Sequence, residues 1–140
     1  MAWYWDKGEA VMYKNLNQLK QGVQVGQKVK VTNVMRNMTK DRVVTEVRTN
    51  GISTGNEISH DEYLRRKGLW LAKGNGNIKE IDGRYFTTTR LDYQKAKHMQ
   101  FEGNTVKFLA FDYDSHGNTV TSPSPDFKDG DVWLELEFID

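Results

Sequence analysis

Residues 42–52 have the sequence RVVTEVRTNGI, which holds the clearest strand and turn signals in the chain. Val43 and Val47 alternate with charged side chains, the period of two that is typical of a half-buried strand. Asn50 and Gly51 follow, the pair preferred in type I′ hairpin turns. We therefore expect a strand that turns back at this pair into an antiparallel neighbour.

The same alternation recurs on both sides of this unit. Upstream, Lys28 and Lys30 alternate with valines, so we expect a strand with its valines on the core side. Downstream, Asp82 and Gly83 predict a second tight hairpin. Further strands are expected at Ile78–Ile81, Arg84–Thr88, Thr105–Tyr113 and Val132–Ile139. In the last of these, the two glutamates are expected to be exposed opposite an apolar face.

Two short helices are indicated by capping signals. Asn15 is expected to cap the first helix. Ser59 and Glu62 have capping-box spacing, and Gly68 is expected to end the second helix. The apolar run Leu69–Leu71 then predicts a buried strand. The expected class is therefore α+β: a twisted antiparallel β-sheet or a partly open small β-barrel with two or three short helices.

Composition limits the class of protein further. The 140 residues, 37% hydrophobic and 28% charged, predict a single globular domain over residues 1–140. The absence of cysteine excludes disulfides, thiol catalysis and thiolate metal sites. No apolar run reaches membrane-spanning length, and the first residues lack the features of a signal peptide. We expect a cytoplasmic protein with no membrane partner.

The net charge of +1 hides an uneven distribution. Residues 14–107 hold 18 Lys and Arg against nine Asp and Glu, whereas residues 108–140 hold one lysine against eight acids. Such asymmetry predicts a dipolar surface and a polyanionic partner for the basic part. The alternative is that folding interleaves the two segments and cancels their fields.

Signals for catalysis and metal binding are weak. Asp112–Gly117 has the D-x-D and glycine spacing of a calcium loop, but the twelfth position, which needs an acid, is Pro123. Gly74–Asn77 lacks the lysine and the spacing of a phosphate-binding loop. The histidines are scattered and form no ligand pair on a helix: His60, His98 and His116. We expect no catalytic residues, no metal and no cofactor.

The strongest functional signal is a basic strand face. Cationic side chains alternate with valines on two expected strands, and neighbouring strands would place four of them on one surface. Arg36 and Lys40 lie on the connection between these strands. A groove of this kind follows a phosphate backbone, with aromatic side chains for stacking on bases. The candidate partner-binding residues are Lys28, Lys30, Arg42, Arg48, Arg65, Arg66, Tyr63 and Trp70. The alternative is an ordinary solvated sheet face. Trp133 is the candidate for an exposed aromatic side chain.

Two resemblances add expectations. Residues 110–122, AFDYDSHGNTVTS, resemble the final hairpin of bacterial fibronectin type III-like modules, which implies a β-sandwich used in protein interaction. Residues 42–51 and 63–71 resemble small accessory proteins carried by phages and mobile elements of Gram-positive bacteria. That class includes inhibitors of host-defence nucleases, anti-CRISPR proteins among them. The resemblance implies a stand-alone protein that acts by binding, and no functional residue is carried over from it.

The leading hypothesis is a non-catalytic protein that binds a nucleic acid or a nucleoprotein complex through the basic face. A second is a structural or protein-interaction module, such as a virion or surface component. A third is a small-ligand binder or enzyme whose site is assembled from distant residues, a histidine and a carboxylate among them.

Overall fold

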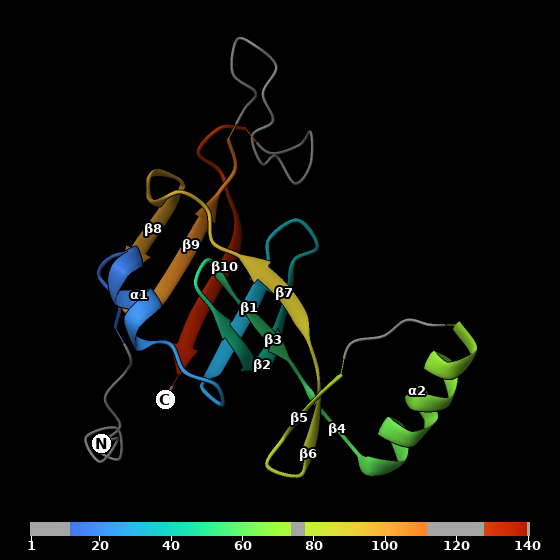
Figure 1. Ribbon diagram of the computed structural model, residues 1–140. Helices are drawn as coiled ribbons and strands as arrows, with labels where there is room; N and C mark the ends of the chain where they lie inside the picture. The colour runs from blue at the N-terminus through green and yellow to red at the C-terminus, as the bar shows by residue number, and fades with distance from the viewer. Residues whose placement is uncertain (1–11, 74–77, 112–127, 140) are drawn as a thin grey trace.

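A partly open barrel and a projecting arm make up the computed structural model (Figure 1). The structure describes residues 12–73, 78–111 and 128–139, and between residues 69 and 73 only the backbone. The α+β class, with an antiparallel sheet curled into a half-barrel and two α-helices, confirms the expectation from the alternation pattern.

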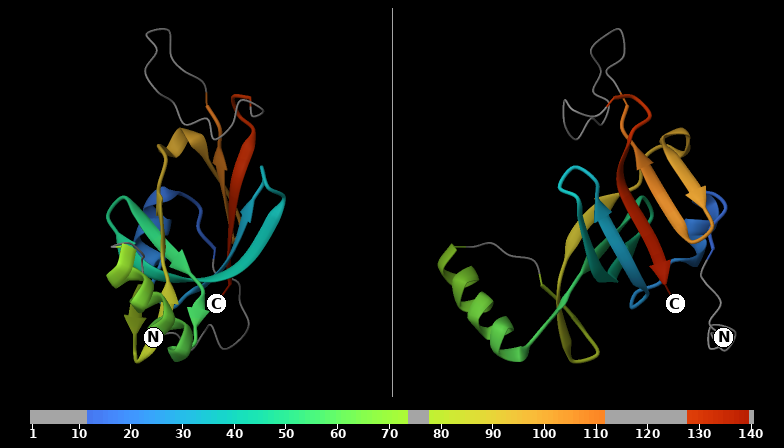
Figure 2. Two further views of the ribbon diagram at one scale, coloured as in Figure 1. Left: turned by 90° about the vertical axis from the view of Figure 1, so that its right-hand side faces the viewer. Right: turned by 180° about the vertical axis from the view of Figure 1, so that it is seen from behind.

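The main sheet has seven antiparallel strands. They are β1 (Lys28–Asn33), β2 (Met38–Arg48), β3 (Gly51–Gly55), β7 (Thr89–Asp92), β8 (Met99–Glu102), β9 (Thr105–Leu109) and β10 (Val132–Ile139). Their order is β7-β3-β2-β1-β10-β9-β8, so two strands that are consecutive in the sequence, β7 and β8, lie at opposite ends. The short connection between them, which includes η2 (Ala96–His98), crosses the open side of the curled sheet (Figures 1 and 2).

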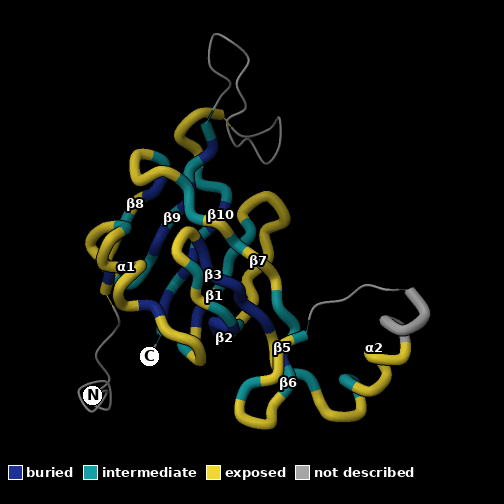
Figure 3. The backbone as a smooth tube through the Cα atoms, viewed as in Figure 1, coloured by how far each residue is buried: buried dark blue, intermediate teal, exposed yellow. Residues whose placement is uncertain are grey.

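The hydrophobic core fills the inner face of this sheet (Figure 3). Leu19 from α1 (Leu16–Gly22) packs there with Phe108 and Phe138, and all three are fully buried. The ring of Tyr13 meets that of Phe138 edge-on at 5.2 Å. The expected cap of α1 is confirmed, because Asn15 Oδ1 accepts a hydrogen bond from the Gln18 amide at 2.9 Å.

Strand β1 lies between β2 and β10, and its register assigns every neighbour to a face. Val29 pairs with Phe138 on β10, so both belong to the inner face, and Lys28 and Lys30 belong to the outer face. The bounds predicted for the last strand are those observed. Trp133, expected to be exposed, instead packs against the core, and its Nε1 donates to Gln94 Oε1 at 3.1 Å. A register shift between Val132 and Leu134 takes it out of the regular alternation.

The arm is an insertion into the hairpin that β3 and β7 form. It contains β4 (Glu57–Ile58), α2 (His60–Lys73), β5 (Ile78–Ile81) and β6 (Arg84–Thr87), with the strands in the order β4-β6-β5. It extends away from the barrel in all three views (Figures 1 and 2). The predicted hairpin between β5 and β6 is confirmed, with positive φ of 51° at Asp82 and 77° at Gly83.

Helix α2 begins as expected and ends later than expected. Ser59 Oγ accepts a hydrogen bond from the Glu62 amide at 3.0 Å, which confirms the cap. The helix then passes through Gly68 and continues to Lys73, so both the stop at Gly68 and the strand at Leu69–Leu71 were wrong. A helical glycine costs only about 1 kcal/mol, too little to end a well-capped helix, and a three-residue apolar run does not distinguish strand from helix.

The hairpin between β2 and β3 forms, but not around the expected turn. Arg48 pairs with Gly51, so Thr49 and Asn50 make the turn, and Gly51 begins β3 without a positive φ. A Cβ atom on Gly51 would overlap the backbone of Leu91 on β7. The glycine is therefore required for close strand approach rather than for a type I′ turn.

A second close approach occurs where the arm leaves the barrel. A Cβ atom on Gly55 would overlap the backbone carbonyl of Thr87, so Gly55→Ala should lower the free energy of unfolding by about 2–3 kcal/mol. Gly68→Ala is the control, because nothing lies within 4 Å of its Cβ position, and it should stabilise the protein by about 0.5–1 kcal/mol. Urea unfolding measures both; equal stabilities of the two variants would contradict the close approach.

Candidate functional site

The predicted basic face does not form as one surface. β1 and β2 are neighbours, as expected, but Arg42 pairs with Val29 and therefore belongs to the inner side of the sheet. Lys28 pairs with Val43, which lies on the outer side instead. The expectation of four cations on one face was wrong. Val43 and Val44 are adjacent, so the sequence allows either of them to face the core, and Val44, 0% exposed, is the one that does.

Arg48 is held by neighbours on its own and adjacent strands. A register shift between Val44 and Glu46 places its guanidinium 2.7 Å from Glu46 Oε1 and 2.7 Å from Ser53 Oγ. Asp92 on β7 lies 3.5 Å away. The hydrogen bond from Arg48, with a second from Ser53, lowers the pKa of Glu46. Arg48 thus fastens three strands together and is not free for a partner.

Acidic side chains flank the outer-face lysines. Lys30 pairs with Asp41 on β2 and with Glu137 on β10, so a carboxylate stands on either side of it. Glu135 follows on the same face, opposite Thr32. The acidic end of the sequence therefore does fold beside the basic strands, and it balances the charge of this face.

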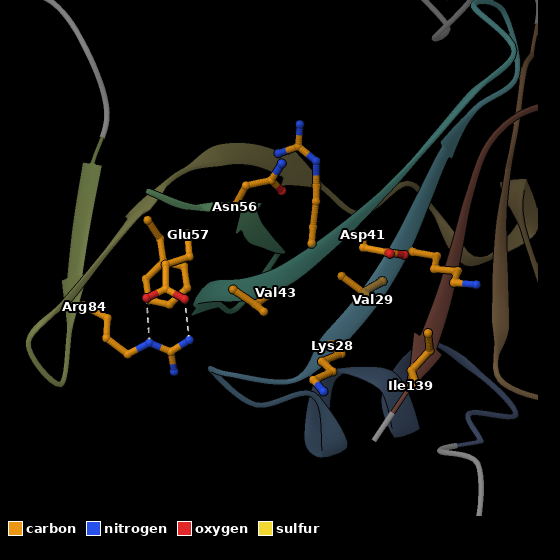
Figure 4. Close-up of a pocket in the computed structure, with 12 residues that line it drawn as sticks. Lys28, Val29, Asp41, Val43, Asn56, Glu57, Arg84 and Ile139 are labelled. Carbon is orange, nitrogen blue, oxygen red and sulfur yellow. Dashed lines mark hydrogen bonds and ion pairs between the residues drawn. The ribbon is translucent and has the colours of Figure 1, made fainter. Parts of the chain in front are cut away.

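A groove of about 530 Å³ separates the outer face from the arm (Figure 4). Val43, Ile139 and Phe86 contribute apolar lining, with charged residues around them. Arg84 makes a bidentate ion pair with Glu57, in which Arg84 Nε lies 2.8 Å from Glu57 Oε2. This pairing lowers the pKa of Glu57. The charged lining of the groove is completed by Lys28, Lys30, Asp41 and Arg42. Neither of the described histidines, His60 and His98, lines the groove.

The candidate residues on α2 gather on the arm, away from Lys28 and Lys30 (Figure 1). Arg65 and Arg66 both bind Glu62, each at 2.6 Å. Tyr63 stacks on Tyr85 of β6, with ring centroids 4.0 Å apart and planes 8° apart, so it packs α2 against the strands of the arm. Trp70 lies on α2, and its side chain is outside the described part of the chain.

The two described histidines, His60 and His98, are engaged in ring contacts. The ring centroids of His60 and Tyr85 lie 5.7 Å apart, and the ring of His98 stacks on that of Phe111 with centroids 3.7 Å apart. Burial, with Lys97 nearby, lowers the pKa of His98. Across the described ranges no group of three or more His, Asp or Glu could hold a metal ion, and no described helix is long and apolar enough to cross a membrane. Three sequence candidates lie outside the described residues: Asp112–Gly117 with His116, Gly74–Asn77, and most of the fibronectin-like hairpin.

Five cations without carboxylate partners lie in what we call the β1–β2 corner, residues 28–42, and the other unpaired cations are lysines spread over the rest of the described chain. All seven arginines of the chain are described, and five of them form ion pairs with Asp or Glu. The two that form none with any described residue, Arg36 and Arg42, both lie in the corner. Arg42 Nη1 donates to the backbone oxygen of Thr54, at 3.5 Å. Lys28, Lys30 and Lys40 likewise form no ion pair within the described residues.

The corner is a hairpin in which β2 has one unpaired edge among the described strands. Strand β3 ends at Gly55 opposite Val43, so no described strand pairs with residues 38–42 on the side of β2 that faces away from β1. At the turn, Asn33 Oδ1 accepts from the Arg36 amide at 3.1 Å, and the Val34 amide donates to the Trp133 carbonyl at 3.1 Å. The paired asparagines around VMR in the sequence NVMRN signal such a turn, although its role was not predicted.

Comparison of the chain with known protein families, with curated proteins and with solved structures found no match. The function is therefore argued from the geometry of the corner, the groove and the arm.

The arginines on α2 make a titration prediction. They lower the pKa of Glu62 from 4.5 to about 2, chiefly through the hydrogen bond from Arg65. Because the folded-state pKa lies below the unfolded one, this contribution to α2 is complete above pH 4.5 and is lost as the pH falls towards 2. A carboxyl titration by NMR should show the lowered pKa of Glu62, and the Arg65→Ala/Arg66→Ala variant should return that pKa towards 4.5. Arg90→Ala is the control; titration of wild-type Glu62 near 4.5 would refute the pairing.

Proposed function

We propose that the protein is a non-catalytic binding protein that contacts the phosphate backbone of a nucleic acid, free or within a nucleoprotein complex, through the β1–β2 corner. The observation that carries the proposal is the contrast among the arginines. Five are satisfied by carboxylates, whereas Arg36 and Arg42 share the corner with Lys40 and pair with no carboxylate in the described part of the chain. Guanidinium groups without a carboxylate partner suit bidentate recognition of phosphate.

The placement of these cations supports contact along an edge rather than across a flat face. Lys40 and Arg42 pair with Val31 and Val29, so they leave β2 on the inner side of the sheet. Lys28 leaves β1 on the outer side. At the free edge of β2 the cations lie on the inner side and Asp41 lies on the outer side, so a phosphate backbone would run along the inner side of that edge. Such contacts give affinity with little sequence preference.

The binding residues proposed from the structure differ in part from those expected from the sequence. Arg48, Arg65 and Arg66 bind carboxylates of their own structural elements, so the proposal no longer rests on them. Lys30 contributes less than the inner-side cations because Asp41 and Glu137 flank it. The phage-type role, as an inhibitor of a host-defence nuclease, stays a proposal in which this corner would contact the nucleic acid of the complex.

The test is fluorescence anisotropy with labelled duplex DNA, single-stranded DNA and RNA across a salt series. Wild type should bind at least one of them with an affinity that falls linearly in log–log form against salt. Reversing Arg36, Lys40 and Arg42 to Glu should remove most of the affinity. The salt slope on duplex DNA should also flatten, by about 0.9 for each phosphate that the variant no longer neutralises.

The control carries the same change of charge elsewhere. Lys14, Lys20 and Lys95 form no ion pair within the described residues, and their reversal to Glu changes the net charge equally. Unfolding curves would establish that both triple variants fold. Equal loss of binding in the two variants would show an unspecific effect of net charge and would reject the corner.

A second candidate, a protein-interaction module, is favoured by the arm. Leu64 on α2 is 50% exposed, and α2 is joined to the rest of the arm through Tyr63 and Tyr85. A stable homo-oligomer with no nucleic-acid affinity, disrupted by Leu64→Glu, would support this function over the first.

A further inference from the structure

We propose that the turn of the β1–β2 corner, residues 34–38, is an apolar wedge that enters the base stack of duplex DNA and bends it. This inference rests on the proposed function and specifies its ligand and its mode. It concerns the apolar side chains of the tip, whereas the phosphate contacts concern Arg36 within the tip and the cations of the strands behind it.

Exposed apolar side chains cluster at this tip more closely than elsewhere in the described residues. Val34, Met35 and Met38 are 38%, 47% and 45% exposed, and they account for three of the seven exposed large hydrophobic side chains in the described residues. Single exposed hydrophobic residues are ordinary on protein surfaces. A cluster within five consecutive positions instead marks an interaction site.

Disorder of the turn does not explain this exposure. Its backbone is tied by hydrogen bonds from the Val34 amide to the Trp133 carbonyl and from the Asn37 amide to the Val34 carbonyl, at 3.1 and 3.2 Å. Asn37 has a φ of 52°, the left-handed conformation that asparagine tolerates. Behind the turn, Thr32 and Thr39 join the two strands through their hydroxyls at 2.9 Å. The structure therefore holds the backbone of the turn in place while its apolar side chains face solvent.

The spacing of cations behind the tip fits a DNA groove. Arg36 lies within the turn, and Lys40 and Arg42 follow Met38 by two and four residues. At about 3.3 Å per residue these positions lie roughly 7 and 13 Å behind the apolar tip. The minor groove is about 7.5 Å deep, so a tip at the base edges would bring Lys40 level with the phosphates. Proteins that kink DNA combine basic side chains with apolar wedges, methionine among them.

An anionic lipid surface is the competing ligand, since it also takes apolar and basic side chains. A bilayer surface is planar, however, and interfacial segments place their cations beside the inserted residues. Here the cations extend back along both strands, with Lys28 five residues before Asn33. At about 3.3 Å per residue that is roughly 17 Å from the tip, beyond a Debye length at physiological salt. The arrangement therefore favours a duplex that runs along the corner.

The experiment is ligase-catalysed circularisation of DNA fragments near one persistence length, about 150 base pairs. Wild type should accelerate ring closure because a kink brings the ends together. Val34→Ser/Met35→Ser should lower that acceleration about tenfold, while anisotropy shows duplex affinity within about threefold of wild type. The matched control is Val25→Ser/Leu64→Ser, which removes two side chains that are 47% and 50% exposed but lie outside the corner. It should leave both readouts unchanged.

The outcomes separate this inference from the proposed function. Salt-dependent duplex binding without accelerated closure, or closure unaffected by the tip variant, overturns the wedge and leaves the phosphate-binding corner intact. Absence of duplex binding by wild type overturns the wedge, and absence of binding to duplex DNA, single-stranded DNA and RNA alike overturns the proposed function as well. The last experiment uses vesicles with about 30% phosphatidylserine. If the protein binds these vesicles more strongly than duplex DNA, and the tip variant loses that binding, the tip is assigned to lipid and the wedge is rejected.

Discussion

The pairing of β1 with β10 is the constraint on which the rest of the structure depends. It joins Val29 to Phe138 across more than a hundred residues of chain and so links the strands β7-β3-β2-β1 to the strands β10-β9-β8 around one core. Closing so long a loop carries a large entropic cost, which burial of the inner-face side chains offsets. The same pairing fixes the electrostatics, because it sets Glu137 beside Lys30 and brings the charge of the outer face close to balance. Both core and charge pattern therefore follow from one strand register.

The arm imposes the second constraint by ending β3 early. The main-sheet strand stops at Gly55, where the chain enters the arm at Asn56, and this leaves residues 38–42 of β2 as a free edge among the described strands. Charged side chains on such an edge protect it against pairing with other chains, which is one reason for Lys40 and Asp41 to be there. Edge protection does not account for Met35, since an exposed apolar tip works against it. The tip therefore needs an explanation of its own, and binding supplies one.

The fold was predictable where one local interaction decides the structure. The caps at Asn15 and Ser59 and the turn at Asp82-Gly83 depend on neighbours a few residues away, and each is observed. The candidate site was harder, because the face that Arg42 takes depends on which of two adjacent valines enters the core. That choice is made by packing in the core, where Val44 lies in one cluster with side chains from distant strands. The length of α2 was missed for a related reason: Gly68 weakens a helix without ending it.

The distribution of ion pairs links folding to function. Arg48 joins three neighbouring strands, Arg84 joins β4 to β6, and Arg65 braces the first turns of α2, so each of these paired arginines holds an element of structure. Exposed pairs of this kind contribute little stability, so their value here is to fix geometry and to remove free positive charge from those surfaces. The cations that remain unneutralised then stand out against a nearly neutral protein, with a net charge of +1. In the proposed function, an anionic partner would be directed by the two arginines that have no carboxylate partner in the described part of the chain, Arg36 and Arg42. Because Lys30 is flanked by acids, the attraction is strongest at Arg36, Lys40 and Arg42, on the side of the corner nearest the apolar tip.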